Sequence, residues 1–447
     1  MRRVAERFPD ELVVIGVHSP KFEAEKETPA LAAAVARHGI EHPVVNDRDF
    51  AIWQAYGARA WPTVVLVDPQ GYVLAQQAGE IDADELSKQL ESWIAEYRER
   101  GALTAEPLPF SSVPMAARSG LLAFPAKVAL AAGFRASATA SNGAGSSSSP
   151  LVAWVADTDH HRVLELELEP GAPRARLRRS FGSGEAGFGD GPAERAAFRR
   201  PHGLTSNGAT LYVADTDNHA VRGIDLQSGA VRTLAGTGEM ARHFVAPQGD
   251  PRRIPLRSPW DVLAAEDIVF VAMAGSHQIW VLMEERELLI LAGTGREALV
   301  DGHVAEASFN QPSGLALAGS ILFVADAEAS AIRAISIEGD ARVQTIVGRG
   351  LFDFGDVDGT GDEVRLQHPT GIAWAAPYLY AVDTYNDKVK RVDPGKREVV
   401  RIASGFAQPE GIAAGDGFLL VADTNAHRLG RVDLATGQVD TLEIDGG

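Results

Sequence analysis

The stretch PHGLTSNGATLYVADTDNHAV, residues 201–221, decides the fold, because variants of it recur along the chain. A proline opens each copy, and 14 residues later a strand-like segment ends, in most copies at an aspartate. In one copy Pro125 and Asp157 lie 32 apart, and the excess equals the length of residues 133–150, a small polar segment typical of a flexible insert. Self-similarity of this kind indicates a repeat architecture, here of six units. The aspartates are Asp157, Asp215, Asp326, Asp383 and Asp423.

Each unit contains four short strand-like runs. In the second unit they are residues 202–205, 210–214, 220–225 and 230–235. Four antiparallel strands per repeat are typical of one propeller blade, and closing six blades into a ring removes long open edges. The sequence therefore predicts a mainly β fold, a six-bladed β-propeller over residues 124–447. We expect closure through pairing of residues 439–444 with the first blade, or through a strand from residues 106–111.

The unit resembles the NHL repeat, whose pattern is Pro-x-Gly-(Ile/Val) followed by a strand ending in Asp-Thr-x-Asn-x-(Arg/Lys)-(Val/Ile). The third unit departs most, with Asp261 in place of the glycine and Met273 in place of the aspartate. Two other units carry the pattern most fully, at Pro201, Gly203, Asp215, Thr216, Asn218 and Val221, and at Pro369, Gly371, Asp383, Thr384, Asn386, Lys388 and Val389.

Residues 1–100 have a different character, because strand-like and helix-like patterns alternate there. This order predicts an α/β layer. Residues 101–123 are irregular, contain three prolines and are predicted to be a linker. The predicted strands are residues 11–19, 42–46, 63–67 and 72–78, and the predicted helices are residues 28–38, 48–56 and 82–100.

Together with the propeller, these first hundred residues resemble the NHL repeat-containing protein 2 family, which joins a thioredoxin-like domain to an NHL propeller. The segments that carry the resemblance are residues 13–22, 42–47 and 61–63, and the Asp-Gly pairs at 190–191 and 301–302. Trp61, Pro62 and Thr63 match the cis-proline loop of thioredoxin-like folds. The resemblance therefore implies a cis peptide bond between Trp61 and Pro62.

One departure from that family concerns cysteine, of which the chain has none. Family members begin with a strand carrying a cysteine motif, and residues 1–8 align with the end of the helix that follows it. The resemblance thus implies an incomplete thioredoxin-like domain without its central strand. The two flanking strands could pair directly, the domain could be loose, or the natural protein could start upstream; we favour the last.

The amino-acid composition excludes some kinds of site and argues against some kinds of partner. Without cysteine, disulfides, thiolate nucleophiles and thiolate metal sites are excluded. A net charge of −18 argues against a nucleic-acid partner, and a short run of arginines within residues 174–179 reads as a solvated strand face. No apolar run approaches the roughly 18 residues of a membrane helix, so we expect no membrane partner. The start has no signal-peptide core, which favours a cytoplasmic protein.

No catalytic, metal-binding or cofactor-binding residue is assigned from the sequence. Four histidines at one repeat position, His161, His219, His277 and His427, lie one per blade and cannot converge on zinc. The repeated aspartates are expected to accept backbone N–H groups in their turns, as a structural role. The acidic segment 353–362 is expected to be a solvated loop. Its spacing lacks the bidentate glutamate of a calcium loop, and the Gly-x-Gly segments follow outer strands rather than opening a helix.

The leading hypothesis is a non-enzymatic interaction scaffold. Long inserts leave the same face of the propeller as the repeat turns, and long loops on a rigid scaffold usually carry binding, here of a protein or peptide. One alternative is a thiol–disulfide oxidoreductase-like protein in a longer form with upstream cysteines. Another is a metal-dependent lyase or hydrolase, which needs polar residues converging in the central channel, whereas the first strands read as apolar. The inserts are residues 182–200, 238–256, 295–310 and 348–366.

Overall fold

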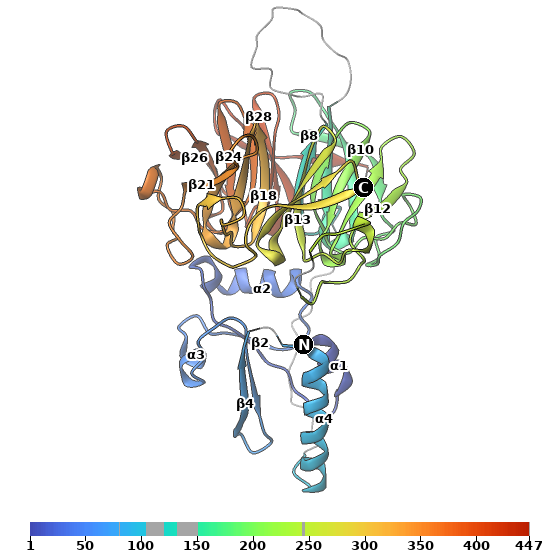
Figure 1. Ribbon diagram of the computed structural model, residues 1–447, viewed down its shortest axis with the longest axis vertical. Helices are drawn as coiled ribbons and strands as arrows, with labels where there is room; N and C mark the ends of the chain where they lie inside the picture. Colours follow the sequence, from blue (N-terminus) through green and yellow to red (C-terminus); the bar gives the residue numbers. More distant parts are fainter. Residues whose placement is uncertain (80, 104–119, 132–150, 244–245, 447) are drawn as a thin grey trace, which may run out of the picture. The chain divides into compact units, whose positions relative to one another are not determined.

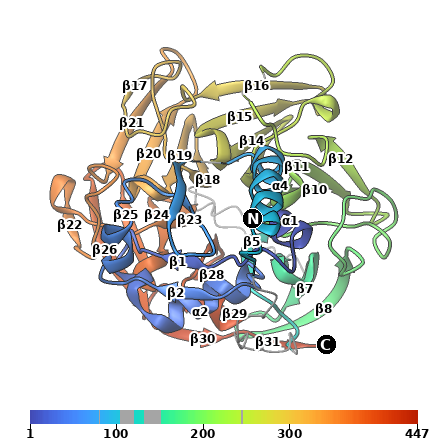
Figure 2. The same ribbon diagram turned by 90° about the horizontal axis from the view of Figure 1, so that it is seen from below.

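The computed structural model describes residues 1–79, 81–103, 120–131, 151–243 and 246–446. The chain divides into two compact units, Met1–Ala117 and Arg118–Gly447; Figure 1 labels elements of both. The predicted mainly β fold is confirmed, since the second unit is a six-bladed β-propeller whose sheets radiate from a common axis (Figure 2). In the described residues no helix is both long and apolar enough to cross a membrane.

Each blade is an antiparallel sheet of four consecutive strands. The innermost strands are β5 (Pro125–Leu130), β9 (Pro201–Ser206), β13 (Pro259–Ala265), β18 (Pro312–Ala318), β23 (Pro369–Ala375) and β27 (Gly411–Ala414). The second strands are β6 (Leu151–Asp157), β10 (Thr210–Asp215), β14 (Ile268–Met273), β19 (Ile321–Asp326), β24 (Tyr378–Asp383) and β28 (Phe418–Asp423). The third strands are β7 (Arg162–Leu168), β11 (Ala220–Asp225), β15 (Gln278–Met283), β20 (Ala331–Ser336), β25 (Lys388–Asp393) and β29 (Arg428–Asp433). The outer strands are β8 (Arg174–Phe181), β12 (Val231–Ala235), β16 (Glu287–Ala292), β21 (Arg342–Val347), β26 (Glu398–Ser404) and β30 (Val439–Thr441).

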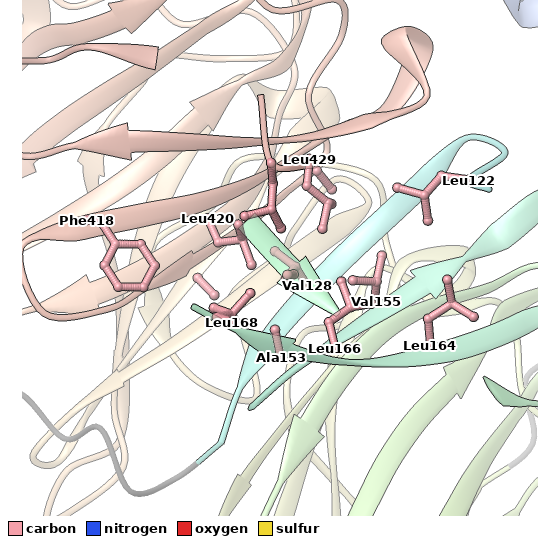
Figure 3. Close-up of a cluster of buried hydrophobic side chains, with 14 residues drawn as sticks. Leu122, Val128, Ala153, Val155, Leu164, Leu166, Leu168, Phe418, Leu420 and Leu429 are labelled. Atoms are coloured by element: carbon pink, nitrogen blue, oxygen red, sulfur yellow. The ribbon is translucent and has the colours of Figure 1, made fainter. Parts of the chain in front are cut away.

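The second strands are apolar along nearly their whole length because both of their faces are buried between neighbouring blades. Six hydrophobic clusters result, one at each interface between blades. Figure 3 shows the cluster that closes the ring, where Val155 and Leu166 of the first blade pack with Leu420 and Leu429 of the sixth.

The C-terminal end also pairs with the first blade. Strand β31 (Glu443–Asp445) runs parallel to β8, with Glu443 opposite Arg174. The expected closure by the C-terminal segment is therefore found, although Val439–Thr441 itself forms the outer strand of the sixth blade. The alternative strand at residues 106–111 lies outside the described residues.

The first unit contains helices and two separate strand pairs. Strands β1 (Gly16–His18) and β2 (Val44–Asn46) pair in parallel, and β3 (Thr63–Val67) and β4 (Val73–Ala78) pair antiparallel. The described residues form no ladder between these two pairs. The helices are α1 (Arg2–Arg7), α2 (Thr28–Arg37), α3 (Ala51–Ala55) and α4 (Ala83–Glu99), and α1 and α4 share a small core.

The predicted strand over residues 11–19 is wrong in its extent, because only Gly16–His18 is paired. The physical reason is pairing: in the described residues the segment before Gly16 has no neighbouring strand whose ladder it could join. Apolar side chains in this region are consequently open to solvent, with Ile15 at 49% and Val67 at 46% exposure. The alternative of direct pairing is also wrong, because β1 and β3 do not pair in the described residues.

Candidate functional site

The candidate site is one end of the propeller, here called the insert face. It carries the six short 3-10 turns between second and third strands, and the inserts between blades leave from it. The turns are Thr158–His160, Thr216–Asn218, Ala274–Ser276, Ala327–Ala329, Thr384–Asn386 and Thr424–Ala426.

The turn aspartates are buried structural acceptors. The side chains of all five are fully buried. In the second blade, Oδ1 of Asp215 accepts the backbone N–H of Arg199 at 2.8 Å, and the other four make the equivalent bond at 2.6–2.7 Å. We expected these donors inside the turn. They lie instead in the segment that enters the blade, so each aspartate joins the end of the second strand to the start of the first.

Buried cations, which sequence reasoning missed, complete this arrangement in three blades. Arg222 is fully buried and donates to Asp215 and to Asp190, both at 2.8 Å. Arg333 does the same with Asp326 and Asp301, both at 2.9 Å. The sequence does contain a signal for these buried cations, because in each of the three blades a basic residue stands seven positions after the turn aspartate.

In the fifth blade the buried cation is Lys390, which donates to Asp358 at 2.6 Å and to Asp356 at 2.8 Å. The expectation of a merely solvated acidic loop at residues 353–362 is therefore wrong. Two of its carboxylates surround a lysine whose side chain is 1% exposed, because a buried ammonium requires anionic partners.

In the second and fifth blades the inner and outer carboxylates around the cation have pKa values shifted in opposite directions. Burial raises the pKa of Asp215 to about 6 and that of Asp383 to about 7, against the cations and hydrogen bonds that stabilise the charged forms. For Asp190, burial also acts to raise the pKa, but hydrogen bonds from Thr233 and the charge of Arg222 outweigh it and hold the pKa below its usual range. In the second blade the outer carboxylate, Asp190, is thus the more firmly ionised partner of Arg222.

A ring of side-chain hydrogen bonds ties each blade to the next. The residue that ends each 3-10 turn has a left-handed backbone and accepts the N–H of the residue before the next blade's proline. His219 Nδ1 accepts from Ser258 at 3.1 Å, and His427 Nδ1 accepts from Phe124 at 3.1 Å, which closes the circle. The other acceptors are His161, His277, Ser330 and Asp387. The histidines therefore serve blade contacts rather than a shared centre.

This role makes stability depend on pH through His219. Burial, with the charges of Arg199 and Arg257, lowers its pKa from 6.5 to about 4. Because the unfolded chain takes up the proton first, stability contributed by the neutral ring is present above pH 6.5 and is lost as the pH falls towards 4. His219→Ser, which copies Ser330, should flatten this part of the pH profile of unfolding by urea. An unchanged profile would show that the ring is not the titrating group.

The inner strands bring polar side chains together at the axis. Lys127 is buried and its Nζ donates to the carbonyl oxygens of Ser313 at 2.7 Å and Thr370 at 2.6 Å. It lies 3.6 Å from Oδ2 of Asp261, which accepts the N–H of Leu315 at 2.9 Å. Burial lowers the pKa of Lys127 and raises that of Asp261, while their opposite charges act against both shifts.

The expectation that the first strands present only apolar residues at the channel is therefore wrong. Besides the Lys127–Asp261 pair, His202 Nδ1 lies 4.0 Å from a carboxylate oxygen of Glu410 at the same end of the axis. The error arose because the polar residues occupy the two positions after the opening proline, whereas the apolar ones follow. Within the described ranges, no group of three or more His, Asp or Glu side chains is placed to hold a metal ion.

The cis-proline loop lies in the first unit. The Trp61–Pro62 peptide bond is cis. The indole Nε1 of Trp61 donates to the carbonyl oxygen of Ser19 at 2.8 Å, and Thr63 Oγ1 donates to that of Ala60 at 2.6 Å. Trp61 is 48% exposed and its ring centroid lies 4.6 Å from that of Trp53.

Exposed apolar side chains gather in the inserts. Among the described propeller residues, eight large apolar side chains are exposed, and five of them belong to the four inserts. The most exposed is Phe352 at 74%. The other four are Phe188, Met240, Val300 and Val357.

Comparison with known proteins gives matches over nearly the whole chain. An NHL repeat model matches residues 406–431. NHL repeat-containing protein 2 of Bos taurus is 34% identical over 97% of this chain and 64% of its own length. Protein SUPPRESSOR OF QUENCHING 1, chloroplastic, of Arabidopsis thaliana is 37% identical over 97% of this chain and 42% of its own. The chain thus spans less than two-thirds of the length of these relatives.

Partial and structural matches add to these. Thiol-disulfide oxidoreductase YkuV of Bacillus subtilis is 28% identical over 20% of this chain and 62% of its own length. Among solved structures, a chain of the nidogen/laminin complex aligns over 64% of this chain and 91% of that chain, with 15% identity and a TM-score of 0.47.

Proposed function

From homology to NHL repeat-containing protein 2 over 97% of the chain, we propose that this protein is an interaction scaffold whose insert face holds a protein or peptide partner. The NHL propeller is in general a platform for protein interaction. The buried ion clusters and the ring of turn hydrogen bonds give that face a rigid base, on which the inserts are presented.

The observation that carries the proposal is the concentration of exposed apolar side chains in the inserts. Scattered apolar residues on a surface are common, but five of the eight exposed in the described propeller residues lie in the inserts, and a grouping of this kind marks a contact surface. Phe352 is the strongest single candidate for an anchor, because an aromatic side chain that becomes buried on binding dominates interface energetics.

The test is a double variant, Phe352→Ser with Val357→Ser, compared with Val400→Ser on the outer strand β26. Both variants remove exposed apolar surface, but only the first removes it from an insert. Affinity purification from the source cells with quantitative mass spectrometry should show partners reduced about tenfold or more for the insert variant, equivalent to about 1.4 kcal/mol. Equal recovery from both variants and the unmodified protein, with unchanged thermal unfolding, would contradict the proposal.

The partial match to a thiol-disulfide oxidoreductase favours a second candidate, a redox function in a longer form that carries cysteines. The 447-residue chain cannot exchange thiols by itself, because none of its residues is cysteine. The mass of the native protein's N-terminal peptide from source cells tests this candidate. A longer start with a paired cysteine motif would support it, and a start at Met1 would exclude it.

A further inference from the structure

The blades differ in what pairs with the outer side of their outer strands. In the first, fourth and fifth blades a fifth strand pairs with the outer strand: β31, β17 (Gly302–His303) and β22 (Gly359–Thr360). In the second blade Gly191 bridges Val231. In the sixth blade the outer strand is only three residues long. In the third blade β16 is six residues long, and nothing in the described chain pairs with its outer side.

The backbone of β16 offers hydrogen-bonding groups at this edge. In the second blade Val231 exchanges N–H and C=O bonds with Gly191 at 2.8 and 3.0 Å, and the N–H of Thr233 donates to Asp190. The ladder to the third strand puts Leu288 and Ile290 in the positions of Val231 and Thr233. The N–H groups of Leu288 and Ile290 therefore face outward from the third blade.

The missing fifth strand has a local cause. In the second, fourth and fifth blades an Asp-Gly pair lies along the outer strand, as a bridge in the second and as a strand in the other two, and the buried cation binds its aspartate. The third blade has Trp280 where that cation would stand and Met273 where the turn aspartate would stand. The third blade therefore has no buried cation at this position that could bind an aspartate of the preceding insert. In its described residues this insert contributes no strand along β16.

The side chains of β16 suit an extended apolar partner. Its sequence is ELLILA, and Leu289 and neighbouring Met283 are 39% and 36% exposed. Proteins usually protect such edges with charge, proline or a covering segment. At the start of the strand lie Glu284 and Glu287, and no comparable acidic pair follows its end.

We propose that the outer edge of β16 binds an extended segment of a partner protein as a fifth, antiparallel strand. The segment carries apolar side chains at alternate positions, followed by basic residues opposite Glu287. In the fourth and fifth blades the equivalent edge is paired with β17 and β22, and both run antiparallel to their outer strands. The bound segment is given the same direction relative to β16. The main-chain bonds would give affinity and the alternate side chains specificity.

A second copy of the chain fits the edge less well. Each copy carries a net charge of −18, which opposes self-association. A six-residue edge also buries far less than the roughly 1,200 Å² of a stable dimer. This surface lies on the outer rim of one blade, so the inference does not depend on the proposed role of the insert face.

The probe is a synthetic decapeptide of alternating valine and threonine that ends in two lysines. Titration calorimetry should give saturable binding to the full chain, and hydrogen exchange should slow about tenfold at Leu288 and Ile290 when the peptide is present. Ile290→Pro removes one outward N–H, and Leu289→Lys adds a charge at the edge. Each should weaken binding at least about tenfold.

Val400→Lys is the matched control, because Val400 holds the position of Leu289 on an edge already covered by β22, and it should bind as the unmodified protein does. A peptide ending in two glutamates should bind at least about tenfold more weakly. Equal binding to the control and the Leu289→Lys variant would overturn the proposal. So would a concentration-dependent dimer, seen by sedimentation, that Leu289→Lys dissociates, since the occupant would then be a second copy.

Discussion

Replacing Arg333 by alanine is expected to lower the free energy of unfolding of the propeller by about 3–5 kcal/mol. The guanidinium is fully buried and donates to Asp326 at 2.9 Å and to the carbonyl oxygens of Ser308 and Val300 at 3.0 and 2.9 Å. Its removal leaves the buried carboxylate of Asp326 without its cation and takes one donor each from the carbonyl oxygens of Ser308 and Val300, which costs more than the ion pair contributes. Urea unfolding followed by tryptophan fluorescence measures the loss.

The third blade supplies the control for this substitution. There Met273 and Trp280 occupy the positions of Asp326 and Arg333, so the natural fold accepts an uncharged pair. The double variant Asp326→Met with Arg333→Trp should therefore be more stable than Arg333→Ala. A loss below about 1 kcal/mol for Arg333→Ala would show that the buried pair is not required.

Lys127→Met should cost a similar amount, about 3–5 kcal/mol, at neutral pH. The ammonium reaches from the first blade to carbonyl oxygens of the fourth and fifth, and it neutralises Asp261 of the third. Without it, Asp261 remains as a buried charge. Because burial already raises the pKa of Asp261, the carboxyl group takes up a proton more readily in the variant. The loss should therefore shrink as the pH falls.

A second substitution distinguishes the effect of the uncompensated Asp261 charge from the effect of packing lost in Lys127→Met. Asp261→Gly restores the glycine that the repeat pattern favours and removes the uncompensated carboxylate. Added to Lys127→Met, it should recover part of the lost stability, and the pH dependence of the loss should disappear. The same destabilisation at acidic and neutral pH in Lys127→Met alone would show that lost packing, rather than the charge of Asp261, is responsible.

The repeat made the propeller predictable because each unit repeats the same local chemistry. Pro201 and Asp215 mark where an inner strand begins and a second strand ends, and the observed strands follow those marks. The α/β unit was less predictable. Its local patterns placed the helices near their observed positions, but strand length depends on a partner. Residues 11–15 read as a strand and lack the neighbour that would make them one.

The site was predictable only in outline. The turn aspartates and histidines were identified as structural, but their partners were not, because those partners lie in other segments. Asp301 joins Arg333 across 32 residues, and Lys127 reaches Thr370 across 243. Such contacts depend on how blades stack around the axis. Lys127 in particular stands where most units have glycine, which local pattern reading treats as a minor departure.

The closure of the ring has a consequence for synthesis on the ribosome. The first blade shares its hydrophobic cluster with Leu420 and Leu429, and its entry residue Phe124 donates to His427, 303 residues later. Blades two to five can each pack on a neighbour soon after they emerge. The first blade must keep one apolar face uncovered until the sixth is made, at a usual rate of roughly 5–20 residues per second. The earliest-made blade is thus the last to be completed, and during translation it is the part most exposed to chaperones and to misassociation.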